Sequence, residues 1–229
     1  MSAFALHAIE TGRFRLDGGA MFGVVPRPLW EKRLAPDERN RILLAMRCLL
    51  LEGADRLVLV DAGLGHKYDA RFQELYAVDH ETATLERSLG AAGFGPDDVT
   101  DVVLTHLHFD HGGGVTTREG DRLRLTFPNA QHHVQRRHWD WARTPNPREK
   151  ASFFAENIGP LEAEGVLVLH DGPGEILPGI RVRTFDGHTE AQQVVLAEGP
   201  HGTVAFVADL LPTQHHLGAA WTMGYDVRP

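Results

Sequence analysis

Residues 105–114, THLHFDHGGG, place three histidines and an aspartate within six positions. Neutral imidazole and carboxylate are ligands that suit Zn²⁺ or a similar divalent ion. A metal ion that hydrolyses a substrate needs about three protein ligands and one position for water. The four candidates in this segment are too many for one such site and too few for two: His106, His108, Asp110 and His111. Further ligands are therefore expected from other strand ends.

Two such places fit this expectation. His188 stands in the turn-like stretch FDGHTEAQ, and Asp209 follows the apolar run VAFVA. A turn histidine and a helix-capping aspartate are the ordinary interpretations of these two residues. The incomplete ligand set of the upstream cluster makes both residues candidates for further ligands.

The backbone of the cluster is predicted from the directions of its side chains. In a single helix over residues 106–111, His106 and Asp110 would share one face, whereas His108 and His111 would lie on another. If a strand instead runs through His108, residues 106 and 108 point the same way, and a turn at Asp110 brings in the next two ligands. Gly112–Gly114 would then allow the chain to leave this turn with positive φ.

The elements that position the cluster are predicted from the segments before it. The apolar runs at 41–53 and 56–65 end in glycine and predict neighbouring buried strands, although the first is long enough to be a helix instead. Residues 81–99 have Leu85 and Leu89 at helical spacing, with Gly93 as a stop, and TDVVLT predicts the next strand. This β-α-β passage delivers the histidines to the C-terminal end of a strand, where α/β proteins commonly bind ligands. We find no repeat or linker, so one domain is expected.

Composition excludes several classes of function. The 23 basic and 31 acidic residues give a formal net charge of −8, which makes nucleic acid an unfavourable partner. No stretch approaches ~18 uninterrupted apolar residues, and the N-terminus lacks a signal-peptide pattern, so neither a membrane span nor export is expected. The single cysteine, Cys48, suits a reducing compartment. We therefore expect a cytoplasmic protein, with a homodimer left open.

The motifs THLHFDHGGG, DGHT and VAFVADL, in this order and with VLVDAGLG upstream, resemble the metallo-β-lactamase-fold hydrolases. The resemblance implies an α/β fold of the four-layer αββα sandwich type, with a two-metal site in the groove between the sheets. By this match one ion would be held by His106, His108 and His188, the second by Asp110 and His111, with Asp209 bridging them. Asp61 in VDAGLG would orient a ligand histidine or the metal-binding loop.

Two divalent ions in such a site, with zinc favoured and iron or manganese as alternatives, can share a water and present hydroxide near neutral pH. The expected reaction is hydrolysis of an ester, lactone, thioester or amide of a small molecule, with Asp110 orienting the hydroxide or carrying its proton. The family includes quorum-quenching lactonases and glyoxalase II-like thioesterases. Such lactonases often carry a tyrosine soon after the bridging aspartate, whereas Tyr225 is the nearest here. A di-iron oxidoreductase of the same fold and a catalytically silent metal-binding domain are the alternatives.

Three residues are predicted to contact substrate. Phe22 and Trp30 lie in GGAMFGVVPRPLWEK, which we interpret as a loop that supplies an apolar wall of the groove. His216, in TQHH, is expected to border the groove rather than to serve as a ligand. The family pattern continues with one more histidine on a later strand, beyond Pro229. We therefore expect a single domain over residues 1–229 that lacks the closing helix and strand of the fold.

Overall fold

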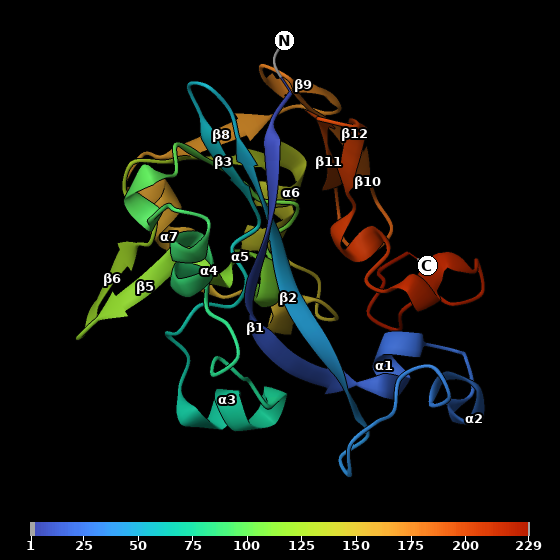
Figure 1. Ribbon diagram of the computed structural model, residues 1–229. Coiled ribbons are helices and arrows are strands. Elements are labelled where there is room, and N and C mark those ends of the chain that lie inside the picture. Colours follow the sequence, from blue (N-terminus) through green and yellow to red (C-terminus); the bar gives the residue numbers. More distant parts are fainter. Residues whose placement is uncertain (1–2, 229) are drawn as a thin grey trace.

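The computed structural model describes residues 3–228, and its largest element is a mixed sheet of six strands in the order β1-β2-β3-β4-β7-β8 (Figure 1). The pairs β1–β2 and β2–β3 are antiparallel, and the remaining pairs are parallel. The strand bounds are β1 (Ala5–Asp17), β2 (Arg41–Glu52), β3 (Leu57–Val60), β4 (Asp101–Val103), β7 (Gln131–Gln135) and β8 (Leu167–His170).

A second, antiparallel sheet of four strands in the order β12-β11-β10-β9 packs against the first. Its strands are β9 (Gly174–Leu177), β10 (Ile180–Phe185), β11 (Gln192–Gly199) and β12 (Gly202–Phe206). A separate hairpin consists of β5 (Thr116–Glu119) and β6 (Arg122–Leu125).

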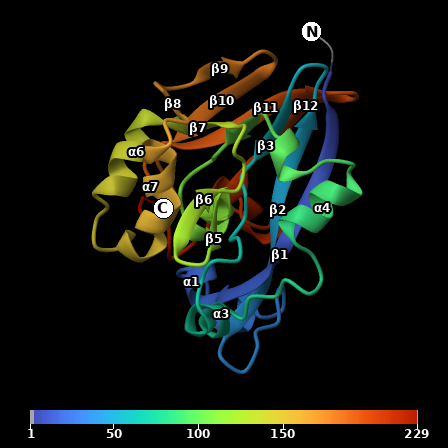
Figure 2. The same cartoon turned by 90° about the vertical axis from the view of Figure 1, so that its left-hand side faces the viewer.

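Helices lie on the other face of the six-stranded sheet, away from the second sheet (Figures 1 and 2). The helices on this face are α4 (Leu85–Ala91), α6 (Arg136–Arg143) and α7 (Ala155–Ala163). The shorter helices are α1 (Gly18–Phe22), α2 (Arg27–Trp30), α3 (Ala70–Tyr76) and α5 (Phe109–Gly112). Within residues 3–228 none of the helices has the length and apolar character that a membrane crossing requires.

Strand β3 shows why its sequence is continuously apolar. Leu57 and Leu59 point toward the helices and pack in one core with Leu89 of α4. Val58 and Val60 point the opposite way, into the core between the two sheets. A central strand covered on both faces has no polar side to present to water. Each such side chain stabilises the fold by about 1.5–3 kcal/mol relative to an exposed one.

The α/β architecture with two stacked sheets confirms the predicted fold class. Residues 181 and 183 of β10 are exposed on the outer face of the four-stranded sheet, and within residues 3–228 no α-helix covers that face (Figure 1). The structure thus describes three of the four predicted layers. The predicted strands at 41–53 and 56–65 are confirmed as β2 and β3, and α4 is confirmed as the helix that stops before Gly93, where φ is +91°.

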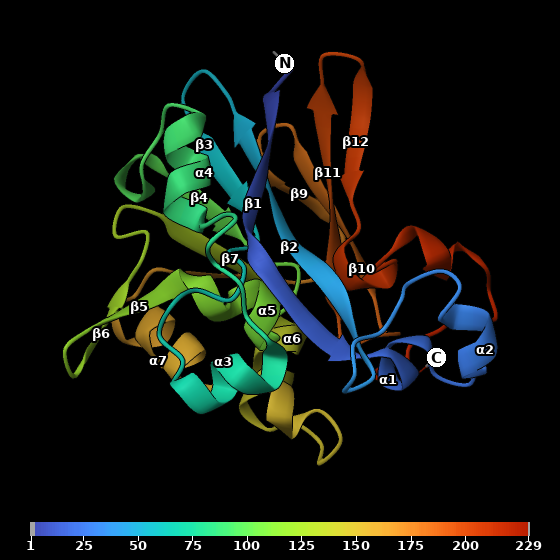
Figure 3. The ribbon, with the colours of Figure 1, turned by 60° about the horizontal axis from the view of Figure 1, so that its bottom comes forward.

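Two local predictions are wrong. Strand β4 ends at Val103, and His108 lies beyond it in chain that is not part of the sheet. The segment that carries Phe22 and Trp30 is not a plain loop but contains α1 and α2, and Asp17 caps α1 by accepting a hydrogen bond from the backbone N–H of Ala20 at 2.8 Å. In Figure 3 the long β1–β2 pair runs to the end of the molecule where these two helices lie.

Candidate metal centre

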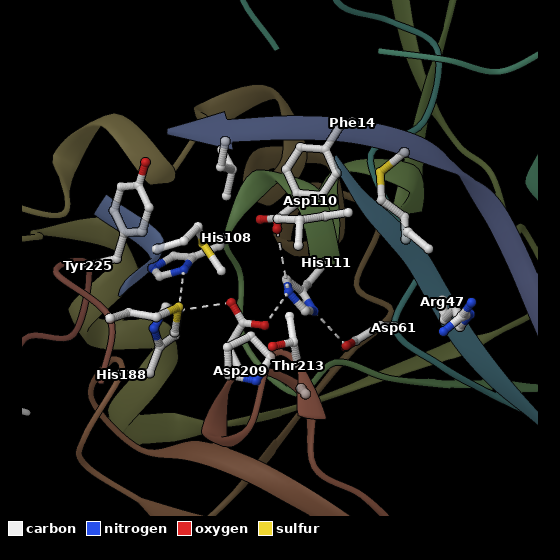
Figure 4. A pocket seen from close by; sticks show the side chains of 18 of the residues that line it. Phe14, Arg47, Asp61, His108, Asp110, His111, His188, Asp209, Thr213 and Tyr225 are labelled. Atoms are coloured by element: carbon white, nitrogen blue, oxygen red, sulfur yellow. Dashed lines mark hydrogen bonds and ion pairs between the residues drawn. The ribbon is translucent and has the colours of Figure 1, made fainter. Parts of the chain in front are cut away.

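Three separate stretches of chain meet to form the site (Figure 4). The extended chain after β4 supplies His106 and His108, and α5, which follows directly, supplies Asp110 and His111. His188 comes from the β10–β11 connection, and Asp209 from a 3₁₀ helix, Ala208–Leu210, just after β12. The structure thus brings together all six residues that were predicted as ligands.

The side chains form two groups that share members. In one group the ligand atoms of His106, His108 and His188 lie within 4.8 Å of one another, and in the other those of His106, His111 and Asp209 do. One oxygen of Asp209 is 3.4 Å from Nε2 of His188, and its other oxygen is 3.3 Å from Nε2 of His111. Asp110 approaches Nε2 of His111 at 3.6 Å. The Asp209 carboxylate therefore lies between the groups, where it can contact an ion in each.

Every histidine of the two groups has a partner for the ring nitrogen that faces away from the site. These pairs are His106 Nδ1 with Thr105 Oγ1 at 3.0 Å, His108 Nε2 with Glu149 at 3.1 Å, His111 Nδ1 with Asp61 at 2.8 Å, and His188 Nδ1 with Asp226 at 3.1 Å. A carboxylate can only accept, so it fixes the N–H on the outer nitrogen. The inward nitrogen then keeps its lone pair for a metal.

Asp61 connects the two groups. It is 1% exposed, and its carboxylate accepts hydrogen bonds from the backbone N–H of Thr105 at 2.8 Å and from the Thr105 hydroxyl, besides contacting His111. Thr105 in turn contacts His106. Asp61 has a positive φ of 59°, a conformation that aspartate and asparagine tolerate better than most residues. Its position is that expected of a carboxylate that orients ligand histidines.

The charges at the site favour a cation. Burial, reinforced by the neighbouring histidines, lowers the pKa of His106 well below its usual value, so this imidazole is neutral. Burial raises the pKa of Asp110, and the Asp209 carboxylate raises it further. Burial lowers the pKa of His111, but Asp209, Asp110 and Asp61 outweigh it and raise the pKa well above its usual range. Carboxylates that favour a proton on His111 also favour a divalent ion in its place.

A buried polar atom without a partner supports the same conclusion. Nε2 of His106 is fully buried and has no hydrogen-bond partner among the described residues. Leaving such a nitrogen unpaired costs about 1–3 kcal/mol. An ion at this nitrogen would remove that cost, so the donor set fits a metal.

The three glycines after His111 serve close packing, not positive φ as predicted. The φ angles of Gly112 and Gly113 are −99° and −63°, and Gly114 also lacks a positive φ. A Cβ on Gly113 would lie 2.3 Å from the carbonyl oxygen of Leu64, and one on Gly114 would lie 2.1 Å from that of Ala62. Glycine therefore lets the turn after His111 pack directly on the loop after β3.

A pocket of about 910 Å³ opens over the two groups (Figure 4). Its walls come from β1, β2, the C-terminal segment and the loops around the site. Large apolar side chains contribute to the lining, including Phe14, Leu44, Met46 and Met223. Tyr225 and His215 also line the pocket.

The predictions for Phe22, Trp30 and His216 are wrong. Phe22 and Trp30 are 0% and 1% exposed and stack on each other in a core behind the pocket wall, because α1 and α2 turn them inward. Met21 of the same segment lines the pocket instead. His216 stacks on Phe22, and its Nε2 lies 2.8 Å from the carbonyl oxygen of Met21, so it packs this core and does not line the pocket.

The sequence analysis missed two carboxylates at the site. Glu149 and Asp226 contact His108 and His188 but lie 41 and 38 residues away from them in the chain. Neither stands in a recognisable motif. The one signal in the sequence for Asp226 is its place directly after Tyr225, the tyrosine that the comparison with lactonases had singled out.

The sequence model of the metallo-beta-lactamase superfamily matches residues 46–224, well over half of the chain. The chain belongs to this superfamily. A crystal structure of a probable metal-dependent hydrolase from Staphylococcus aureus is 32% identical, with a TM-score of 0.90, and the alignment covers 100% of this chain and 82% of that one. The predictions of the superfamily and of a metal-dependent hydrolase are thereby confirmed.

Other similar proteins are lactonases. The N-acyl homoserine lactonase AiiA of Bacillus thuringiensis subsp. kurstaki is 24% identical over 227 residues, which cover 95% of this chain and 80% of the relative. The structure of AidC, a dizinc quorum-quenching lactonase in complex with a product, has a TM-score of 0.77 and 22% identity, covering 100% of this chain and 82% of that one. At this identity the structural likeness supports the fold alone.

Proposed function

We propose that the protein is a dinuclear zinc hydrolase that opens a lactone ring or cleaves a related ester or thioester. One ion would be held by His106, His108 and His188, and the second by Asp110 and His111, with Asp209 between them. The observation that carries the proposal is the Asp209 carboxylate, whose two oxygens approach one histidine of each group at 3.4 and 3.3 Å. The imidazole-rich donor set favours zinc over harder cations such as Mg²⁺.

Two bound ions would supply Lewis acidity and lower the pKa of water toward ~7. The residues of the chain complete this chemistry. The Asp110 carboxylate lies 3.6 Å from Nε2 of His111, and from this place it would take up a proton from the attacking water and return it to the leaving oxygen or sulfur. The outer partners of the four histidines hold the imidazole rings in one orientation, so little reorganisation accompanies the reaction.

The pocket lining supports an uncharged substrate that carries an apolar group. Phe14, Leu44, Met46 and Met223 offer apolar surface beside the metal centre. Tyr225 also lines the pocket, and its phenol, which like any ordinary tyrosine is protonated at neutral pH, can donate a hydrogen bond to a substrate carbonyl. Relatives named as N-acyl homoserine lactonases make acylated lactones the first substrates to test.

The test is an activity panel on the metal-loaded protein with lactones, esters, thioesters and phosphodiesters. We expect two equivalents of zinc and fastest turnover of lactones or simple esters with apolar acyl groups. The variant His108→Ala should lose most of one ion and nearly all activity, because the ion would keep too few ligands. Undiminished metal and turnover in this variant, or preferred hydrolysis of phosphodiesters by the unaltered protein, would contradict the proposal.

The oxidoreductase alternative is not favoured, because the cluster holds histidines and aspartates and the similar proteins are hydrolases. A flavin absorbance scan and an iron assay would test this point. Location in the cytoplasm remains a proposal, supported by a single cysteine, Cys48, which is free and buried. The homodimer also remains a proposal, which light scattering of the purified protein would test.

A further inference from the structure

Glu149 is a buried carboxylate that contacts the metal centre from outside. Glu149 lies between α6 and α7, and its backbone N–H donates a hydrogen bond to the side-chain oxygen of Asn146 at 3.0 Å. The residue is 3% exposed. Its Oε1 is 3.1 Å from Nε2 of His108, and its Oε2 accepts a hydrogen bond from the indole N–H of Trp141 at 2.7 Å. Both carboxylate oxygens are therefore occupied.

His108 differs from the other histidines in the nitrogen that faces the site. Its Nδ1 lies 2.9 Å from Nε2 of His188, whereas its Nε2 points to Glu149. In His106, His111 and His188 the outer nitrogen is Nδ1. A histidine that presents Nδ1 must carry its proton on Nε2, so an acceptor is needed on that side.

We propose that Glu149 is a positioning residue that holds the Nε2–H tautomer of His108 and thereby sets the affinity of one of the two ions, while Trp141 holds Glu149 in place. This inference rests on the proposed metal site. A carboxylate that accepts the outer N–H of a ligand imidazole fixes the ring and makes its inner nitrogen a better donor. The cost of burying the Glu149 charge is offset by its hydrogen bonds with His108 and Trp141, and would be offset further by an ion bound on the opposite side of the His108 ring.

The position of Glu149 makes its effect selective. Its contact is with His108, which belongs to the group of His106, His108 and His188. Asp61, in contrast, contacts His111 directly. Removal of the charge at Glu149 should therefore weaken the ion at His108 and leave the ion at His111 bound as before.

The experiment measures the stepwise loss of both zinc ions to a competing chelator in Glu149→Gln. We expect about 10–100-fold weaker binding of one ion, the usual effect of removing such a partner, and unchanged binding of the other. In Trp141→Phe, which keeps the carboxylate but removes its donor, we expect a smaller loss at the same ion. The spectrum of the cobalt-substituted protein should change in Glu149→Gln, because the donor strength of His108 changes.

Asp101→Asn is the matched control. Asp101 is also 3% exposed and contacts a histidine, His133, at 2.9 Å, but it lies outside the metal centre. Loss of the Asp101 carboxylate should lower the free energy of unfolding without changing the affinity for either ion. The inference is overturned in either of two cases, provided that the unaltered protein binds two ions. In the first, Glu149→Gln and Trp141→Phe bind both ions as tightly as the unaltered protein; in the second, these variants bind both ions more weakly by the same factor. If the unaltered protein binds no zinc, the proposed function itself fails.

Discussion

The substitution Asp61→Asn offers the sharpest test of how the site is held together. Asparagine has almost the same shape as aspartate and tolerates the positive φ of 59° at this position, so the change introduces no backbone strain. It removes the negative charge and replaces one acceptor oxygen by an N–H₂ group. That group would face a donor, either the backbone N–H of Thr105 or the Nδ1–H of His111, because these two groups donate to the two different oxygens of the carboxylate.

The expected magnitude follows from these contacts. A hydrogen bond to a charged group contributes about 1.5–3 kcal/mol. At about 1.36 kcal/mol per tenfold change, loss of one such bond corresponds to about 10–150-fold weaker ion binding. Both ions should be affected, because Asp61 contacts His111 directly and His106 through Thr105. This pattern differs from that of Glu149→Gln, in which one ion is affected.

Chelator competition followed by metal analysis measures the two affinities, and urea unfolding of the metal-free protein measures stability separately. Asp101→Asn again serves as the control for loss of a buried carboxylate. The reasoning is refuted if Asp61→Asn loses stability to the same extent as the control yet binds both ions as tightly as the unaltered protein. Selective loss of one ion would show that Thr105 does not transmit the effect to His106.

Three further predictions concern pH, packing and substrate. The neighbouring carboxylates outweigh burial and raise the pKa of His111, whereas burial lowers the pKa of His108 to about 4. As pH falls, a proton therefore competes with the ion at His111 first, and this ion should be lost at a higher pH than the ion at His108. Metal content measured against pH follows both steps. Gly114→Ala would place Cβ 2.1 Å from a backbone oxygen and should lower the free energy of unfolding by about 1–3 kcal/mol, whereas Gly90→Ala, with nothing within 4 Å, should not. Tyr225→Phe should raise KM about 5–10-fold with metal content unchanged, as expected for one lost hydrogen bond, and an unaltered KM would exclude substrate contact.

The ligand cluster could be predicted from the sequence because its chemistry is local. His106, His108, Asp110 and His111 lie within six positions, and the run TDVVLT just before them indicates the strand that delivers them. The strand nevertheless ends at Val103, since the pairing of β4 with β3 and β7 extends only as far as that residue. The extended chain beyond it is held by isolated backbone hydrogen bonds, such as that from the N–H of Gln193 to the carbonyl oxygen of Thr105 at 2.9 Å, and by contacts of Thr105 with the Asp61 side chain, which no periodicity reveals.

The residues around the ligands could not be predicted, because their positions depend on contacts between distant segments. Glu149 and Asp226 stand in stretches without a recognisable pattern, and only folding brings them to His108 and His188. Phe22 and Trp30 suggested a substrate wall because large apolar side chains in a loop commonly line a groove. They were buried instead, since α1 and α2 provide a small core of their own for these rings.

The contacts of the C-terminal segment have a consequence for the order in which the protein matures. The backbone N–H of Gly224 donates to the carbonyl oxygen of Ala20 at 2.7 Å, and Asp226 holds His188. Pairings between such distant parts of a chain form slowly, because a large loop must close before they stabilise anything. During synthesis on the ribosome, the histidines near residue 106 emerge long before Asp226 does. Tight loading of the proposed metal site would therefore follow the synthesis of the chain through Asp226, and a nascent chain halted earlier would expose unsupported histidines to whichever metal the cell offers.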